Sequence, residues 1–475
     1  MEKACKLLQG KLIEPYQTDG VRWMLEREQD SGGFLCDEMG LGKTIQTITT
    51  MIGNPQNKTL IVCPKSLISQ WVSEIQKFAP FFVVGIYESN THLVNIQNID
   101  VMVTSYSLFS SKKVECPLLR HTWNRVIFDE GHEIRNWSAT RTKNLYKLRA
   151  NIRWILTGTP VFNSLKDFIT LCKVIGIPME TVKTNSVGVC ARYVLRRTKE
   201  DVKIDIPECT FENIDLDMYP EEQDLYNEVI NDSREQIKNM IRYSGNIAMH
   251  NMDILECLLR CRQAMIHPQL YIDGMAKKNG EEPQKWDFRS KKIEKLVEMV
   301  SDVPEDEKSI VFCHFIEEMN MIDNLLSESG IRTFRIDGST STQERALELE
   351  TYKTCPEKSA ILIQIKAGGV GLNIQCATRV FMTSVSWNPA TELQAIGRAH
   401  RTGQTKPVFV YRLVYKSTES CMSVEESMMN LQEHKSIVCS EVLNDPRLLR
   451  KLPKKKHKGD FSIKDIVRLF TQKKK

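Results

Sequence analysis

Short apolar runs rich in β-branched residues recur along the chain, and segments of helical periodicity separate them. This alternation predicts parallel strands joined by helices, because a parallel strand can be reached only through a long crossover connection. A first series of runs covers residues 59–64, 101–106, 125–130 and 153–160, and a second covers residues 308–315, 333–339, 360–365, 379–384 and 408–414. The pattern predicts an α/β fold with two lobes.

Between the two series, residues 219–267 contain no strand-like run. Their apolar residues recur at helical spacing, as at Leu225, Val229, Ile237 and Ile241, and indicate a helical insert. Residues 273–287 combine Gly, Pro and charge without periodicity, which is typical of a flexible connection. We expect four parts: a first lobe at 1–200, a linker with a helical protrusion at 201–288, a second lobe at 289–440 and a basic tail at 441–475.

Composition favours a globular protein, with 41% hydrophobic and 26% charged residues. No apolar run approaches the length of a membrane span, and the amino-terminal residues are too polar for a signal peptide, so we expect an intracellular protein without membrane contact. The 14 cysteines are scattered without a CxxC pair and predict buried free thiols rather than structural zinc.

The net charge of +5 is unevenly distributed, because residues 441–475 hold 12 Lys or Arg against 4 Asp or Glu. We expect residues 451–458 (KLPKKKHK) to bind phosphate or an import receptor. The apolar spacing in residues 461–470 (FSIKDIVRLF) predicts a short helix that folds back on the core. The tail predicts a nuclear protein. If a virus encodes the chain, we expect it at a viral replication site or in the virion instead.

The segment GFLCDEMGLGKTIQTI at residues 33–48 carries the sharpest chemical signal. An apolar run leads into a glycine-rich turn and then into a helical pattern, which is the arrangement of a phosphate-binding loop. Lys43 would reach the β- and γ-phosphate oxygens of a nucleotide, and the Thr44 hydroxyl would ligate Mg²⁺. Asp37 stands where the strict GxxxxGK[ST] pattern has Gly, so the match is to a shorter GxGKT form.

An acidic pair at the end of a later strand complements this loop. Asp129 and Glu130 follow the apolar run RVIF, and His132 comes next but one. Asp129 would hold Mg²⁺, directly or through water, and Glu130 would orient and deprotonate the attacking water. Together the two segments predict a Mg²⁺-dependent site that hydrolyses ATP.

With LTGTP at 156–160 added to these two segments, the chain resembles the Swi/Snf family of superfamily-two ATPases. Further similar blocks are EPYQTDGVRWML (14–25), LIVCPKSLISQW (60–71), VTSYSLF (103–109), YVLRRTKEDV (193–202), RQAMIHPQL (262–270), IDGSTSTQER (336–345), IKAGGVGLNIQCATRVF (365–381) and SWNPATELQAIGRAHRTGQ (386–404). KAGGVGLN, SVEES and FSIKDIVRLF resemble the branch of post-replication-repair translocases and the helicase-like transcription factor. That branch usually carries a zinc-binding RING module, but residues 271–307 contain no cysteine.

The resemblance implies two RecA-like lobes that hydrolyse ATP between them, and it assigns roles to residues of this chain. Nucleotide contacts fall to Gln17 at the base and to Asp37, Gly40, Gly42, Lys43, Thr44 and Gly371. The residues that would couple ATP hydrolysis to movement are His132, Thr157, Thr159 and Gln394. Those that would contact DNA are Lys65, Ser66, Thr104, Ser105, Lys366, Gly368, Gly369 and Trp387. Arg398 and Arg401 would stabilise the charge that develops on the γ-phosphoryl group.

Three departures from the family pattern concern the second lobe. Gln364 or Ile365 stands where Ser or Thr is usual, Gly397 replaces a common Asp, and Thr383-Ser384 replaces an Asp before the WNP turn. The first of these puts a phosphate contact in doubt. None removes a predicted catalytic group.

The sequence thus predicts a monomeric ATP-dependent translocase on double-stranded DNA that remodels protein–DNA complexes or DNA structures in transcription, replication or repair. Nucleosomes, a polymerase or other DNA-bound proteins are candidate partners. Two alternatives remain: a strand-separating DNA or RNA helicase, and a DNA-binding scaffold that does not hydrolyse ATP. The intact Lys43, Asp129, Glu130 and Arg398 argue against the scaffold.

Overall fold

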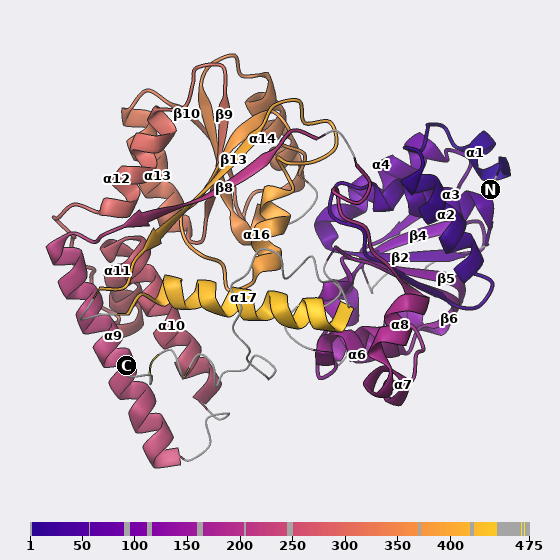
Figure 1. The fold of residues 1–475 in the computed structure, drawn as a ribbon, viewed down its shortest axis with the longest axis horizontal. Helices are drawn as coiled ribbons and strands as arrows, with labels where there is room; N and C mark the ends of the chain where they lie inside the picture. Colours follow the sequence, from indigo (N-terminus) through magenta and orange to yellow (C-terminus); the bar gives the residue numbers. More distant parts are fainter. Residues whose placement is uncertain are drawn as a thin grey trace. The chain divides into compact units, whose positions relative to one another are not determined.

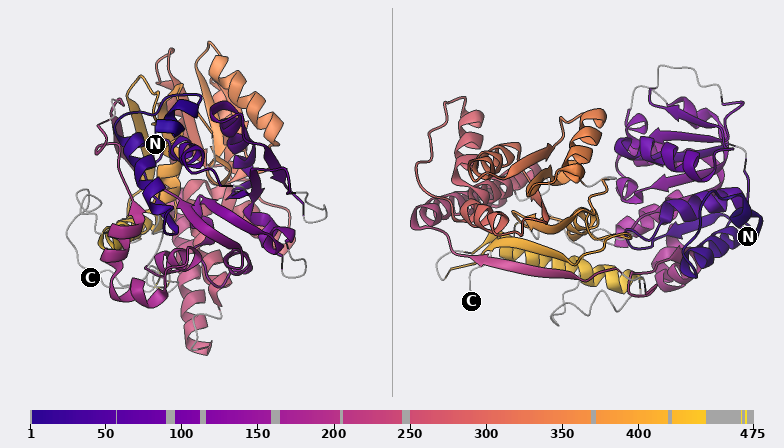
Figure 2. Two further views of the ribbon diagram at one scale, coloured as in Figure 1. Left: turned by 90° about the vertical axis from the view of Figure 1, so that its right-hand side faces the viewer. Right: turned by 90° about the horizontal axis from the view of Figure 1, so that it is seen from above.

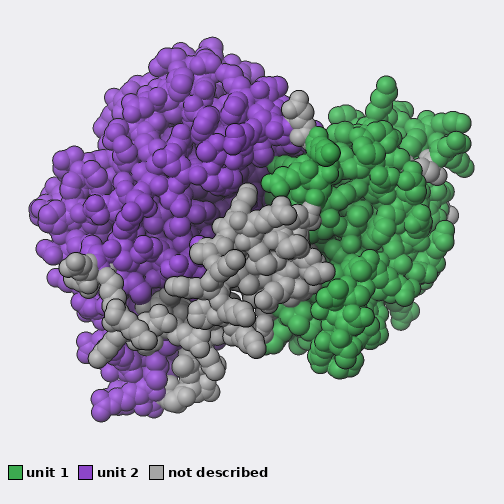
Figure 3. Space-filling model, in the orientation of Figure 1, with its two compact units in different colours: residues 1–205, 436–453 green, residues 206–435, 454–475 purple. Residues whose placement is uncertain are grey.

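The computed structural model describes residues 2–56, 58–89, 96–111, 116–158, 165–203, 206–244, 250–368, 372–418, 422–443, 467 and 470. The chain divides into two compact units, one of residues 1–205 and 436–453 and the other of residues 206–435 and 454–475 (Figure 3). Each unit is built around one sheet, as the two series of apolar runs predict.

The first unit contains a seven-stranded sheet with the order β3-β4-β2-β5-β6-β1-β7. Its strands are β1 (Gly32–Leu35), β2 (Thr59–Cys63), β3 (Val84–Tyr87), β4 (Val101–Ser105), β5 (Thr122–Asp129), β6 (Arg149–Leu156) and β7 (Val194–Leu195). Its helices are α1 (Glu2–Leu7), α2 (Tyr16–Arg27), α3 (Lys43–Gly53), α4 (Ile68–Phe78), α5 (Thr140–Tyr146), α6 (Leu165–Val174), α7 (Met179–Thr184) and α8 (Ser186–Tyr193). Short 3₁₀ turns are η1 (Lys65–Leu67), η2 (Tyr106–Phe109), η3 (Pro117–Arg120) and η4 (Gly131–Ile134).

All strand pairs described in this sheet are parallel, and helices cover both of its faces (Figure 1). In Figure 1, α2, α3 and α4 lie on one side of the strands and α6, α7 and α8 on the other. The central strands are fully buried because both faces are covered, so they appear in the sequence as continuous apolar runs.

The second unit contains a six-stranded parallel sheet with the order β10-β11-β9-β12-β13-β8, seen from two further sides in Figure 2. Its strands are β8 (Cys209–Leu216), β9 (Lys308–Cys313), β10 (Arg332–Ile336), β11 (Ser359–Gln364), β12 (Ala377–Met382) and β13 (Val408–Tyr415). Its helices are α9 (Pro220–Ser244), α10 (Asn251–Ile266), α11 (Pro268–Asn279), α12 (Lys291–Ser301), α13 (Ile316–Glu328), α14 (Thr342–Thr354), α15 (Ile365–Gly368) and α16 (Pro389–Ile396), and α17 (Val424–Leu443) begins here.

Two apolar clusters cover opposite faces of this sheet. In β9, Ile310 and Phe312 belong to one cluster, whereas Val311 and Cys313 belong to the other. This assignment follows from the two-residue period of a strand, whose successive side chains point to opposite faces. The sheet is therefore packed on both sides.

The structure departs from the sequence-based prediction around the helical insert. Strand β8, which no apolar run announced, pairs with β13 at the edge of the second sheet, and its burial pattern shows mostly exposed or half-buried residues. The insert is part of the second unit, because Tyr226 of α9 and Leu258 of α10 share one core cluster with the sheet. Helix α11 also occupies the first half of the predicted connection at 273–287.

The predicted basic segment 451–458 lies outside the described residues. Within the predicted terminal helix, the structure describes Val467 and Phe470, which are helical and buried in the core cluster of the second unit. The described cysteines are free, and most are buried. None of the described helices is long and apolar enough to cross a membrane.

Candidate ATP-binding site of the first unit

The glycine-rich loop lies between the buried strand β1 and helix α3, which begins at Lys43. Gly40 and Gly42 have φ values of 90° and 77°, in the left-handed region where glycine is favoured. A Cβ atom on Gly42 would lie 2.4 Å from Nε2 of Gln17. Thr44 follows in the first turn of α3, so exposed N–H groups at a helix amino terminus, a lysine and a hydroxyl share one loop.

Lys43 is held by the loop itself. Its Nζ donates a hydrogen bond to the backbone oxygen of Asp37 at 2.8 Å, across the turn. The side chain is only partly buried. An ammonium group held in this way is ready to meet phosphate oxygens that approach the end of α3.

Gln17, the predicted base contact, packs against the same loop from α2. Its Nε2 donates to the backbone oxygen of Leu41 at 3.2 Å and to the Tyr16 hydroxyl at 3.1 Å, and its Oε1 accepts from the Ile13 amide at 2.8 Å. The side chain is 4% exposed. The segment predicted to contact the base thus lies directly beside the phosphate loop.

Asp37, predicted to contact the nucleotide, instead uses its carboxylate inside the unit. The group is fully buried, and Arg197 donates to both of its oxygens, from Nε at 2.9 Å and from Nη2 at 2.5 Å. Gln46 donates to Oδ2 at 3.1 Å. Because both oxygens are engaged, Asp37 supports the loop from behind, and only its backbone oxygen faces Lys43.

The acidic pair lies at the carboxyl end of β5. Asp129 ends the strand opposite Leu156 of β6, and Leu156 in turn pairs with Leu35 of β1. The ends of these three neighbouring strands therefore meet at one edge of the sheet, where parallel α/β folds place their ligands. Residues that are far apart in the sequence become neighbours through this strand order.

Asp129 occupies a half-buried position that disfavours its charge. Burial and the nearby Glu130 carboxylate raise its pKa to about 6, although the Trp71 hydrogen bond and the Lys43 charge act in the opposite direction. Trp71 donates from Nε1 to Oδ2 at 2.8 Å, and the Glu130 amide donates to Oδ1 at 2.9 Å. A cation beside this carboxylate would favour its ionised form, and carboxylate and hydroxyl oxygens such as those of Asp129 and Thr44 are of the kind that Mg²⁺ prefers.

Glu130 and His132 form a pair just beyond the strand. Glu130 adopts a left-handed conformation with φ of 50°, which turns the chain sharply out of β5 into η4. His132 Nδ1 lies 3.3 Å from Oε2 of Glu130. The turn places this carboxylate immediately beyond Asp129 and gives it a histidine neighbour.

Thr157 and Gly158 follow β6 and complete this edge. The Thr157 amide donates to the backbone oxygen of Leu35 at 3.2 Å, and the residue is fully buried. A Cβ atom on Gly158 would lie 3.9 Å from Lys43 Nζ. The predicted coupling segment thus adjoins the lysine, while Thr159 lies outside the described residues.

The predicted DNA contacts of this unit divide into two groups. Lys65 is exposed and Ser66 half-buried, both in η1. The prediction that Thr104 contacts DNA is wrong for its side chain. This side chain is fully buried, and its hydroxyl donates to the backbone oxygen of Tyr87 at 2.8 Å. Ser105 is 3% exposed, and its hydroxyl lies 2.6 Å from that of Ser107.

In the second unit, Arg398 and Arg401 lie on a loop organised by Gln404. Its Nε2 donates to the backbone oxygens of Gln375, Ala377 and Ala399, at 2.9, 3.2 and 3.2 Å. Its Oε1 accepts from the amides of Thr405 and Lys406 at 2.9 and 3.1 Å. Gln404 is 6% exposed and Arg398 9%.

Other predicted residues of the second unit occupy varied positions. Gln394 is 8% exposed on α16, and Trp387 packs against the core cluster. Lys366 is exposed at the start of α15, which ends at Gly368. Gly369 and Gly371 lie outside the described residues.

Gln364, which replaces a usual Ser or Thr, joins two predicted segments of the second unit. Its Oε1 accepts a hydrogen bond from the Gly338 amide at 3.2 Å. The side chain thus ties the turn after β10 to the segment that begins at Ile365.

Sequence reasoning missed three side chains that support the candidate ATP site, namely Trp71, Gln46 and Arg197. Trp71 and Arg197 belong to the family-like blocks LIVCPKSLISQW and YVLRRTKEDV, for which no role in the ATP site was predicted. One signal was available, because a buried carboxylate at Asp37 needs a cationic partner. The sequence does not say which cation supplies it.

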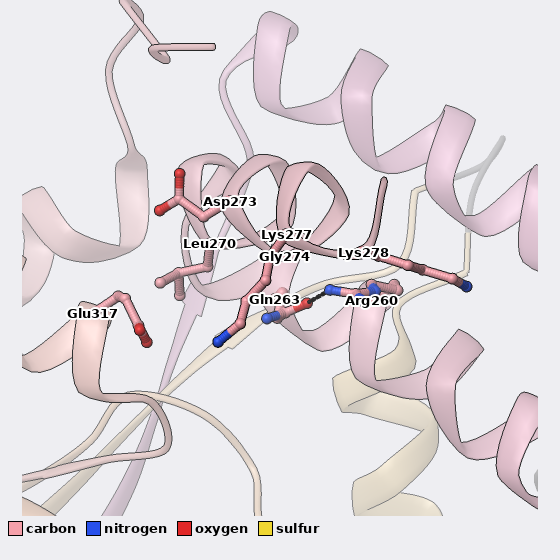
Figure 4. Close-up of a pocket in the computed structure, with 8 residues that line it drawn as sticks. All are labelled: Arg260, Gln263, Leu270, Asp273, Gly274, Lys277, Lys278 and Glu317. Carbon is pink, nitrogen blue, oxygen red and sulfur yellow. Dashed lines mark hydrogen bonds between the residues drawn. The ribbon is translucent and has the colours of Figure 1, made fainter. Parts of the chain in front are cut away.

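A pocket of about 330 Å³ lies among α10, α11 and the first turn of α13 (Figure 4). It is lined by Arg260, Gln263, Leu270, Asp273, Gly274, Lys277, Lys278 and Glu317. Arg260 and Lys278 both pair with Glu256, at 3.3 and 2.8 Å, and Arg260 donates to Gln263. Two of its three cationic side chains thus share one carboxylate, and we assign no ligand to this pocket.

Comparison with known proteins gives two family matches. The model of the SNF2-related domain matches residues 16–184 and 182–270, and the helicase conserved C-terminal domain matches residues 291–403. Together they extend over both units.

Several curated proteins are similar to the chain. The ATP-dependent helicase fft1 of Schizosaccharomyces pombe is 28% identical over 95% of this chain and 55% of its own length. The TATA-binding protein-associated factor MOT1 of Saccharomyces cerevisiae is 28% identical over 91% of this chain and 27% of its own length. A probable global transactivator of Orgyia pseudotsugata multicapsid polyhedrosis virus is 29% identical over 90% of this chain and 91% of its own length.

The chain thus spans about half the length of fft1 and less of MOT1. Among solved structures, a Sulfolobus solfataricus SWI2/SNF2 ATPase core in complex with double-stranded DNA matches with a TM-score of 0.41 and 25% identity. That match covers 94% of this chain and 98% of the other.

Proposed function

The chain belongs to the SNF2-related ATPase family, and from this premise we propose that it hydrolyses ATP to move along double-stranded DNA. One observation carries the ATPase part of the proposal. The strand order brings the loop with Lys43, the Asp129–Glu130 pair and Thr157 to the same edge of one parallel sheet. This is the set of groups that phosphoryl transfer to water requires: phosphate binding, a cation site and a base.

The geometry of the first unit supports the following assignment of roles. Lys43 binds the β- and γ-phosphate oxygens, and Gln17 contacts the base beside the loop. Glu130, next to His132, orients the attacking water and accepts its proton. Thr44 and Asp129 would hold Mg²⁺, which would supply positive charge against the phosphate oxygens.

The second unit contributes Arg398 and Arg401, whose guanidinium groups match the charge that develops on the γ-phosphoryl group. Hydrolysis then depends on closure of the two units around ATP, with Gln394 and Thr157 in the coupling path. Closure and opening change the spacing between the DNA grips of the units. We assign these grips to Lys65 and Ser66 in the first unit, and to Lys366, Gly368 and Trp387 in the second.

These grips contact phosphates rather than bases, so the motor acts without regard to sequence and its DNA affinity falls with salt. Double-stranded DNA is the proposed track, because the likeness of the motifs to those of Swi/Snf ATPases favours movement along an intact duplex. We propose remodelling of DNA-bound proteins or of DNA structures as the outcome, in transcription, replication or repair. The relatives include a TATA-binding protein-associated factor and a viral transactivator, and a nuclear or viral replication site is the proposed location.

The first test measures ATP hydrolysis without nucleic acid and with single-stranded DNA, duplex DNA, RNA and nucleosomes. Duplex DNA should stimulate the rate more than RNA does. Displacement of a triplex-forming strand, without unwinding of a long duplex, should accompany the stimulation. Robust unwinding or a preference for RNA would instead identify a strand-separating helicase.

The second test addresses the ATP site with Lys43→Ala and Glu130→Gln. Both should abolish turnover while DNA affinity stays near that of the parent, because both groups act on ATP. Lys183→Ala and Glu180→Gln are matched controls, since these residues form an exposed ion pair in the same unit. Hydrolysis by the Lys43 or Glu130 variant within twofold of the parent would refute the site.

A further inference from the structure

Arg197 connects three parts of the first unit that the sequence separates widely. Besides its two bonds to Asp37, it donates from Nη2 to Oε1 of Gln46 at 2.8 Å, and from Nη1 to the backbone oxygen of Tyr16. Asp37 belongs to the phosphate loop, Gln46 to α3 and Tyr16 to the helix that contacts the base. A single guanidinium group thus joins the elements of the nucleotide site.

The backbone around Arg197 reinforces this connection. The Cys36 amide donates to the Leu195 oxygen at 2.7 Å, and the Glu38 amide donates to the Arg197 oxygen at 2.8 Å. The Lys199 amide donates to Oε2 of Glu38 at 2.9 Å. Residues 36–38 of the loop therefore run alongside residues 195–199, which continue the parallel pairing of β1 with β7.

Gly20 in α2 provides the space that this arrangement needs. A Cβ atom there would lie 1.9 Å from Oε1 of Gln46 and 2.6 Å from Nη2 of Arg197. A methyl group at this position would displace both side chains without removing any charge. The glycine is helical, so its substitution by Ala favours the helix itself.

The segment 195–199 lies shortly before Asp205, where the chain first leaves the first unit. We propose that Arg197 is a positioning residue that makes this departing segment part of the nucleotide site, so that nucleotide binding and the order of the segment depend on each other. The inference rests on the proposed ATP site but not on DNA or on movement. Through Arg197, nucleotide binding at the phosphate loop would change the order of the segment that leads to the connection between the units.

The test measures the Kd of the complete chain for ADP without DNA, together with the thermal midpoint of unfolding. Arg197→Lys should raise the Kd about tenfold, because a point charge cannot hold two carboxylate oxygens, an amide and a carbonyl at once. Gly20→Ala should raise it to a similar degree with the charges intact. Asp19→Ala, an exposed neighbour on α2, is the control for the helix and should leave the Kd unchanged.

Arg125→Lys is the matched control for stability. Arg125 holds the buried Glu28 through bonds of 2.6 and 2.5 Å in the same unit, so its loss should lower the thermal midpoint while the Kd stays within twofold. If the Kd follows the midpoint across all variants, or if Arg197→Lys binds ADP like the parent, Arg197 has only a structural role and the proposal is wrong.

Hydrogen exchange tests the coupling itself. ADP should slow the exchange of backbone amides at residues 195–199 in the parent and fail to do so in Arg197→Lys measured at saturating ADP. Equal protection in both proteins overturns the coupling. If Lys43→Ala binds ADP like the parent, the ATP site itself is misassigned, whereas loss of DNA stimulation alone leaves this inference intact and refutes only the motor.

Discussion

Replacing Gln404 by Ala should slow ATP hydrolysis without weakening ATP binding. Gln404 lies in the second unit, three residues after Arg401. Its side chain bonds the Ala399 oxygen and the Thr405 and Lys406 amides near both arginines, and it ties them to the Gln375 and Ala377 oxygens beside β12. The proposed nucleotide-binding groups belong to the first unit. The change should therefore affect the transition state and spare the ground-state complex.

The magnitude follows from these bonds. Each buried hydrogen bond contributes roughly 1 kcal/mol, and a buried group left unpaired costs roughly 1 to 3 kcal/mol. Water can enter the space of the lost amide and restore some of the bonds, so we expect about 2 to 3 kcal/mol of loop stability to be lost. Expressed in the rate, this corresponds to a decrease in kcat of roughly 30-fold to 150-fold.

The assay compares kcat and KM for ATP under saturating duplex DNA, and the Kd for ADP. Lys406→Ala is the matched control, because its side chain is half exposed and pairs with Asp306 at the surface. The control should stay within twofold of the parent. An unchanged kcat for Gln404→Ala, or a change confined to KM, would refute the argument that this loop delivers charge to the transition state.

Three further predictions concern the second unit and the tail. Arg401→Ala should lower kcat and leave the Kd for ATP nearly unchanged, and a change confined to KM would contradict its role. Asp337 has its pKa lowered to about 2, because hydrogen bonds from Ser339 and Arg335 and the charge of Arg335 outweigh the opposing effect of burial. Its carboxylate therefore stabilises the fold above pH 4 by at most about 2 kcal/mol, and this is lost as the pH falls towards 2. Asp337→Asn should lower the free energy of unfolding at pH 7 and flatten its decline between pH 4 and 2 in urea titrations, whereas an unaltered decline would exclude this carboxylate as its source. Replacing the five lysines of residues 451–458 by Ala should lower the slope of log DNA affinity against log salt by roughly 2 to 3 units, and an unchanged slope and cellular location would show that they bind neither phosphate nor an import receptor.

The predicted strands of both lobes were recovered because a strand buried on both faces appears as an apolar run in the sequence. The nine runs coincide with β2, β4, β5, β6 and β9 to β13 within a few residues. Strand β8 escaped the same reasoning, since an edge strand with exposed positions carries no such run. The insert was also separated from the second lobe, because periodicity predicts a helix but not the surface against which it packs.

The chemical groups of the proposed ATP site could also be predicted from short segments of the sequence. Glycines at 40 and 42 before Lys43 allow a tight left-handed turn, and Asp129 and Glu130 end an apolar strand, so each half of the site can be recognised within a few residues. The supporting contacts are not local. Arg197 meets Asp37 across 160 residues, and Trp71 meets Asp129 across 58.

Only the order of the strands decides such partners, because β7 lies beside β1 at the edge of the sheet and β2 beside β5 at its centre. The same order buries Thr104, whose hydroxyl is directed to Tyr87 on the neighbouring strand β3. From the sequence alone, a threonine hydroxyl can bind either a phosphate or a backbone carbonyl. The tertiary structure directs the Thr104 hydroxyl to a carbonyl, because it leaves this side chain no access to solvent. The sequence thus determined which groups are present at the site, whereas the packing of one strand against the next determined which of them can face a ligand.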